Sequence, residues 1–156
     1  MIEDNGVVFT NLNGQSALFN NGTWPLRSFE VNGNMRSSPV ERMEEPGEWP
    51  TRSTPGALLL HCGGDLLEND SDAYMIERIR VLNILIPAGI VNNERKMGTL
   101  TLLFNSIEPL VGDCTLDDYP VLPMQALYPS VTEWSITFKV FAGYMIGRNS
   151  GRLYSI

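Results

Sequence analysis

The sequence contains few side chains suited to catalysis, and their spacing decides what they can do. The only histidine, His61, lies between Leu60 and Cys62 in an apolar run. His61, Cys62 and the distant Cys114 are too few for a metal site, and neither CxxC nor HExxH spacing occurs. We therefore expect His61 to be a core or interface residue, and we expect no metal or other cofactor.

The paired acids do not form a catalytic pair either. Glu44-Glu45 and Asp117-Asp118 are sequence neighbours, so their side chains diverge and cannot flank a glycosidic bond. The chain also has no GxxxxGK[ST] phosphate loop, no GxGxxG and no GxSxG. We expect a protein that builds or binds, and not an enzyme.

Charge and composition further restrict the class of protein. The chain has 156 residues, 43% of them hydrophobic, which predicts a single folded domain over residues 1–156. A formal net charge of −7, with eleven scattered basic residues, argues against a nucleic-acid-binding surface. Residues 81–92 form an apolar, uncharged stretch that is too short to insert into a membrane.

The two cysteines lie in different parts of the chain. The N-terminal residues MIEDNGVVF lack a basic segment followed by an apolar one, so they do not resemble an export signal. In a chain without an export signal, Cys62 and Cys114 are expected to be buried free thiols and not a disulfide.

One helix is expected, within residues 69–87, and strands surround it. Apolar residues at Met75, Ile79, Leu82 and Ile86, widened by Ile76 and Leu85, have the spacing of one buried helical face. Asn69, Asp70 and Ser71 are N-cap candidates, and Pro87 ends the pattern. The helix is expected to lie against a sheet, and the helical segment is about 71–86.

The strands are expected to be short. Apolar or alternating runs predict strands at 6–9, 17–19, 24–31, 57–62, 99–104, 107–111, 119–128 and 131–141. The last run is the clearest, because Trp134, Ile136, Phe138 and Val140 alternate with polar residues. Gly63-Gly64 is expected to turn the chain towards the helix, residues 112–118 to form an acidic turn, and the tail from Gly143 to carry little pattern.

A long polar segment separates the early strands from the buried one. Residues 32–55 are rich in Gly, Pro, Arg and Glu and show no sustained period. Such a segment is either a surface loop or an arm that orders against a neighbouring subunit. For an arm, the candidate interface residues are Met35, Arg36, Arg42, Met43, Trp49 and Arg52.

The order of these elements resembles the N-terminal ring-forming domain of the distal tail proteins of long, non-contractile-tailed phages. The likeness rests on layout: WPLRSFEV at 24–31, the arm through Arg52, ALLL at 57–60, the helix 72–86 and EWSITFKV at 133–140. It implies a mainly β fold with one helix (α+β), a split β-sandwich or barrel of the tail-tube type with a flanking helix and a long polar arm. The chain ends at Ile156, so we expect no C-terminal carbohydrate-binding domain.

The resemblance also implies partners and a location. It implies a ring, hexameric in the family, at the distal end of the tail, which joins the tail tube to the hub and fibre proteins. The tape-measure protein is a further candidate partner. DNA passes through such a ring without specific binding. The location implied is the virion tail tip, after assembly in the host cytoplasm.

Two other functions remain open. A tail-tube or tail-terminator subunit shares the plan of a sheet with one helix. A monomeric β-sandwich that binds carbohydrate would use Trp24, Trp49 or Tyr128 as stacking faces, although aromatic residues in strands more often belong to the core.

Overall fold

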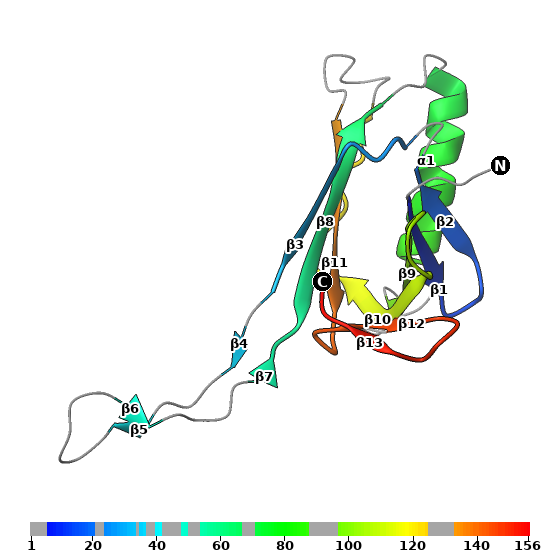
Figure 1. The fold of residues 1–156 in the computed structure, drawn as a ribbon. Helices are drawn as coiled ribbons and strands as arrows, with labels where there is room; N and C mark the ends of the chain where they lie inside the picture. The colour runs from blue at the N-terminus through cyan, green and yellow to red at the C-terminus, as the bar shows by residue number, and fades with distance from the viewer. Residues whose placement is uncertain are drawn as a thin grey trace.

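The computed structural model describes residues 6–20, 24–33, 35–36, 40–41, 48–49, 54–66, 71–87, 97–124 and 133–156. Within these ranges the chain has a single helix, α1 (Ser71–Leu85), and one large sheet (Figure 1). The strands of that sheet are β1 (Gly6–Asn11), β2 (Ser16–Phe19), β3 (Ser28–Asn32), β8 (Leu58–Asp65), β9 (Met97–Leu103), β10 (Leu110–Leu116), β11 (Glu133–Val140), β12 (Met145–Gly147) and β13 (Leu153–Tyr154). Four short strands lie outside it: β4 (Met35–Arg36), β5 (Val40–Glu41), β6 (Glu48–Trp49) and β7 (Thr54–Pro55).

The large sheet is antiparallel and open. Its strand order is β2-β1-β9-β10-β11-β8-β3, with β12 beside β10 and β13 beside β12. Within the described ranges, β2 pairs only with β1 and β3 only with β8, so the sheet is not a closed barrel. The predicted class, mainly β with one helix, is confirmed.

The sheet folds over on itself to enclose the core. Phe9 of β1 stacks on Phe138 of β11 at 5.5 Å, and Phe19 of β2 stacks on Trp134 of β11 at 5.3 Å between ring centroids. Strands from opposite ends of the order therefore face each other across a shared interior. The alternation predicted for β11 is confirmed, because Trp134, Ile136, Phe138 and Val140 are all buried.

Helix α1 closes one side of this core. It begins at Ser71 and ends at Leu85, within one residue of the expected segment, and lies beside β1 and β2 (Figure 1). The Tyr74 hydroxyl donates a hydrogen bond to the Pro123 carbonyl oxygen, and Arg78 Nε donates one to the Leu122 carbonyl oxygen at 2.8 Å. These two bonds attach the helix to the segment that precedes β11.

The predicted buried face of the helix is partly wrong. Ile79 is 53% exposed and Ile76 is 71% exposed, whereas Tyr74, Val81 and Leu85 are fully buried. Leu82, Met75 and Ile86 pack at the margin of the core. Two apolar stripes with helical spacing run along this segment. The stripe that contains Tyr74 faces the core, because Tyr74 packs against Trp24 at 5.7 Å between ring centroids.

Two glycines expected to form a turn instead lie within a strand. β8 continues through Gly63 and Gly64 to Asp65, and both pair with β11. A side chain at Gly64 would overlap the Pro25 carbonyl oxygen, and one at Gly63 would lie 2.8 Å from the Trp134 carbonyl oxygen. These glycines therefore permit a close approach of backbones, which is a known use of glycine inside strands.

Other strand bounds also differ from expectation. The predicted run 24–31 becomes a strand only at Ser28, because Trp24 enters the aromatic core. Residues 112–116, expected as part of an acidic turn, extend β10, with Cys114 and Leu116 buried at alternate positions. The expected strand at 119–128 is reduced in the described part to one bridge, between Val121 and Ser135. The tail, expected to be irregular, forms β12 and β13.

The arm is a two-stranded β-ribbon. β4 pairs with β7 and β5 with β6, in line with the longer pair β3–β8, and the ribbon leads away from the rest of the molecule (Figure 1). We call the described part of 35–55 the arm and the remainder of the chain the body. From the pair Asn32↔Leu59 to the pair Met35↔Pro55, the outgoing leg has two intervening residues and the returning leg has three. The register therefore shifts by one residue between these pairs. Such shifts add bend and twist to a ribbon.

Candidate assembly surfaces

The single histidine is held by a neighbouring hydroxyl. His61 lies half-buried on β8, with Nδ1 2.9 Å from Thr137 Oγ1 on β11. Cys62 follows it in the strand and points to the opposite, buried face. His61 therefore belongs to the polar face of the sheet, and Cys62 to the core.

Both cysteines are unreactive structural thiols. Cys62 on β8 and Cys114 on β10 are free and buried, in agreement with the sequence analysis. Burial raises the pKa of Cys62 to about 12, and burial with the nearby Asp113 carboxylate raises the pKa of Cys114 to about 12. Because the thiolate is the reactive form, neither side chain is a nucleophile at neutral pH.

The acid pairs do not assemble into a site in the part of the chain that the structure covers. Asp118 Oδ1 accepts a hydrogen bond from the Tyr119 backbone N–H at 2.8 Å, so this acid stabilises its own turn. Glu44-Glu45 lies outside the described residues. Among the residues that are described, no three His, Cys, Asp or Glu side chains gather as a metal site.

The candidate interface residues are placed only in part. Met35 and Arg36 form β4, and Trp49 lies in β6, opposite Val40. Arg42, Met43 and Arg52 fall outside the described residues. The structure thus places three of the six on the ribbon, and their contacts with a neighbour stay a prediction.

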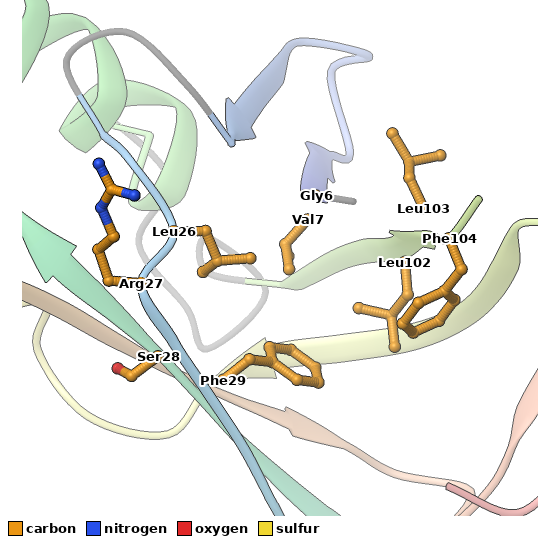
Figure 2. A pocket seen from close by; sticks show the side chains of 9 residues that line it. All are labelled: Gly6, Val7, Leu26, Arg27, Ser28, Phe29, Leu102, Leu103 and Phe104. Atoms are coloured by element: carbon orange, nitrogen blue, oxygen red, sulfur yellow. The ribbon is translucent and has the colours of Figure 1, made fainter. Parts of the chain in front are cut away.

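An apolar pocket lies at the open side of the sheet. It has a volume of about 310 Å³ and is bounded by β3 on one side and by β1 and β9 on the other. Figure 2 shows Leu26 and Phe29 on one wall and Leu102 and Phe104 on the other. We call it the seam pocket. Its lining comes from three segments far apart in the sequence, so no sequence signal indicated it.

A second surface is polar. Over β3, β8 and β11, the side opposite the core carries a hollow of about 520 Å³. Its cross-strand rows are Ser28, Gly63 and Ser135, then Glu30, His61 and Thr137. Asp65 and Glu133 form a pair at the end of β8. We call this surface the polar face; short side chains and carboxylates predominate on it.

The outer face of α1 is a third surface. Ile76 and Ile79 are exposed there, beside the exposed Arg80. Arg80 Nε and Nη2 donate hydrogen bonds of 2.8 and 2.6 Å to the Glu77 carboxylate, and Trp24 Nε1 donates one of 3.2 Å. Arg80 therefore lowers the pKa of Glu77, with a smaller contribution from Trp24. In the described residues no helix has the length and apolar character of a membrane span.

Comparisons with known proteins show which structures share the fold that carries these surfaces. No protein-family model and no curated protein matches the chain. Among solved structures, it is similar to a chain from the tail of an empty gene transfer agent (GTA) particle, determined by helical refinement with C6 symmetry. The TM-score is 0.50 at 13% identity, covering 97% of this chain and 95% of that one.

A second similar chain comes from the virion of a native gene transfer agent particle, with a TM-score of 0.48, 11% identity and coverage of 86% and 89%. At these identities the first likeness establishes a shared fold over nearly the full length of both chains. The fold is therefore that of a protein found in the tail of a virus-like particle.

Proposed function

We propose that this chain is a structural subunit of a phage-like tail that assembles with copies of itself into a closed ring around an open channel. The observation that carries the proposal is the fold likeness to a protein of a C6-symmetric tail, over 97% of this chain and 95% of that one. The C6 symmetry of that tail supports a ring of six subunits. Its partners are further copies of this chain and the other proteins of the tail, and its location is the virion.

Two features of the chain support ring formation. Within the described residues, the main strand order of the sheet ends at β2 and at β3, and these two strands present different edges to neighbours. The arm reaches away from the body and offers a third contact (Figure 1). Different patches on the two sides of one subunit give head-to-tail contacts, and such contacts close into a ring when the rotation between copies allows it.

The polar face suits the wall of the channel. It carries the acids Glu30, Asp65 and Glu133 and the bases Arg27 and Lys139, so it is close to neutral. A wall rich in Lys and Arg would hold the phosphates of passing DNA, whereas an acidic or neutral wall lets DNA slide. The net charge of −7 agrees with this assignment.

The position of the ring within the tail has two candidates. The resemblance in element order favours the distal ring, which joins the tail tube to the hub and fibre proteins. The helical refinement of the similar tail favours a tube subunit, because helical symmetry describes layers that repeat. A sugar-binding module is less well supported, since Trp24, one of its three candidate aromatics, is only 2% exposed.

Native mass spectrometry and negative-stain imaging of the purified protein test the proposal together. We expect a single closed oligomer of six copies and, in images, a ring with a central hole. A distal ring stops at one or two layers, whereas a tube subunit grows into filaments at high concentration. A strict monomer at every concentration and salt would rule out the ring.

A further inference from the structure

An apolar groove opens on the body beside the root of the arm. Its volume is about 580 Å³, and β9, β10, the β1–β2 turn and the turn between β11 and β12 line it. Phe141 is 47% exposed, Leu12 62% and Ile146 42%, so the groove presents large apolar side chains to solvent. Leu153, also exposed, pairs with Ile146 and extends the apolar surface. Contiguous exposed apolar surface of this kind marks interaction sites.

The groove adjoins the arm root in the fold. Phe141 follows Val140, and Val140 pairs with Leu58, the residue at which the returning leg of the arm enters β8. The tip pair β5–β6 lies farther along the ribbon than β4–β7, well away from this place (Figure 1). While the ladders hold, the tip of one copy therefore cannot reach the groove of the same copy.

The arm tip lacks support from its own body. In the described residues, β5 pairs only with β6, and an isolated two-stranded ribbon is at best marginally stable in water. In the β5–β6 ladder, the pair Val40↔Trp49 consists of two apolar residues. Trp is the residue type most often found as an anchor in interface pockets. The ribbon thus supplies an apolar segment that is separated from its own core.

Basic side chains at one end of the groove are opposite in charge to the acidic tip of the arm. The stretch 41–48 contains four Glu and one Arg. Arg148 and Arg152 are exposed on the turn between β12 and β13, next to Ile146; Glu108 accepts a hydrogen bond from Ser150 of that turn, and Asp113 lines the groove from β10. Opposite charges meet when the tip lies towards the β12–β13 turn, which gives the contact a defined direction.

We propose that the groove lined by Leu12, Phe141 and Ile146 receives the β5–β6 tip of the arm from a second copy of this chain. The inference rests on the proposed ring and adds to it the acceptor site and the direction of the contact. Each copy then gives its arm to one neighbour and receives the arm of another, so the two sides of a subunit differ, as a closed ring requires.

Disulfide trapping between two separately purified variants tests the acceptor site. Glu48→Cys places a thiol on the arm tip, and Ile146→Cys places one at the groove. A disulfide needs Cα atoms within about 7 Å, so only a seated tip crosslinks efficiently. The native Cys62 and Cys114 are buried, with pKa values of about 12, and do not compete.

The matched control replaces the groove position with Ile76→Cys, which is 71% exposed on the outer face of the helix. Mixed Glu48→Cys and Ile146→Cys proteins should yield at least about tenfold more mixed disulfide under mild oxidation than the control mixture, because seating raises the local thiol concentration. A different affinity tag on each variant separates mixed from like pairs.

A charge placed in the groove gives an independent readout. Phe141→Glu is expected to weaken self-association by at least about tenfold, because the carboxylate would be buried under the tip. Circular dichroism checks that this half-exposed position tolerates the change. Ile76→Glu, at the site 71% exposed on the outer face of the helix, is the control for added charge alone at an exposed apolar residue.

The outcomes separate the two proposals. An oligomer seen by light scattering without mixed disulfide above the control overturns the groove and leaves the ring standing. A protein that stays monomeric and forms no mixed disulfide overturns both. Mixed disulfide above the control, with weaker association of Phe141→Glu, supports the groove as acceptor.

Discussion

In the body, Phe19 and Trp24 pack against Trp134 of β11, which is 1% exposed, and Tyr74 of the helix packs against Trp24. In the arm, β4 has only β7 as a partner and β5 only β6, within the described residues. The body is thus stabilised by burial of apolar side chains between the sheet and the helix. The ladders of the arm are stabilised only by pairing between neighbouring short strands. A folded unit and a ribbon held by local pairing in one chain support the proposal that the ribbon contacts another subunit.

This contrast predicts that changes in the free energy of unfolding will be large in the body and small in the arm. Four changes test it, in descending order of that effect. Each is measured by urea unfolding followed by far-UV circular dichroism, at a protein concentration low enough that self-association does not add to the apparent stability.

The largest effect is expected from Trp134→Ala. Removing a buried indole that stacks on Phe19 at 5.3 Å and meets Trp24 edge-on at 6.0 Å leaves a large cavity. The expected loss in free energy of unfolding is about 3–5 kcal/mol.

Trp134→Phe is the matched control, because Trp134 Nε1 is buried and has no hydrogen-bond partner within the described residues. Phenylalanine keeps much of the stacking and removes an unsatisfied N–H, so its cost should be clearly smaller than that of alanine. Equal losses for the two variants would mean that the aromatic packing is not what stabilises the body.

The second effect is expected from Gly64→Ala. The added methyl group would overlap the Pro25 carbonyl oxygen and lie 3.2 Å from the Arg27 backbone nitrogen, so backbone must move. The expected loss is about 1–3 kcal/mol.

The control for Gly64 stands at the base of the arm. Gly33→Ala would meet only the end of the Leu58 side chain, at 3.3 Å, and is expected to change the stability by less than about 0.5 kcal/mol. If both alanine variants were neutral, the close approach of Pro25 and Arg27 to β8 would not constrain the strand.

The third effect concerns the ion pair on the outer face of the helix. Glu77→Gln removes the charge that Arg80 neutralises, and the amide oxygen can still accept the Trp24 hydrogen bond. Because the pair is partly exposed, the expected loss at pH 7 is only about 0.3–0.5 kcal/mol.

The pH dependence of this loss has a defined sign. Arg80 holds the folded-state pKa of Glu77 below its ordinary value of 4.5, so the carboxylate stabilises the fold above that value. The stabilisation is lost as the pH falls through the folded pKa. The difference between wild type and Glu77→Gln should therefore shrink below pH 4.5 and vanish in acid. A difference that grows on acidification would contradict the assignment.

Much of the body could be predicted from local pattern. The alternation in 133–140 gave the inward face of β11, and helical spacing with a cap at Ser71 gave the helix. Spacing could not choose between the two apolar stripes of the helix, because that choice depends on Trp24, a tertiary neighbour. Local pattern predicts a turn at the two glycines of β8. The close approach of another backbone segment, which requires glycine there, leaves no signal in the local sequence.

The candidate surfaces were harder to predict for a related reason. The composition of residues 32–55 indicated an arm, but the register of its two ladders depends on cross-strand pairs, which composition does not encode. Cys114 and Leu116 did offer the alternating signal of a strand, although Gly112 and Asp113 obscured it. The seam pocket and the groove unite distant segments, so only the fold brings their residues together.

The smallest effect on body stability is expected from deleting the arm. Replacing residues 36–49 with a short Gly-Ser linker removes the β5–β6 ladder and half of β4, and leaves every described core residue in place. No loss in the free energy of unfolding is expected, because closing a shorter loop costs slightly less chain entropy. Self-association, measured by light scattering, should nevertheless weaken by at least about tenfold, since the deletion removes the tip that carries Trp49. Trp134→Phe gives the converse control, because it perturbs the body and leaves the arm intact. A deletion variant that unfolds at markedly lower urea would place the arm within the cooperative fold, and one that still assembles fully would leave the sheet edges alone to hold the ring together.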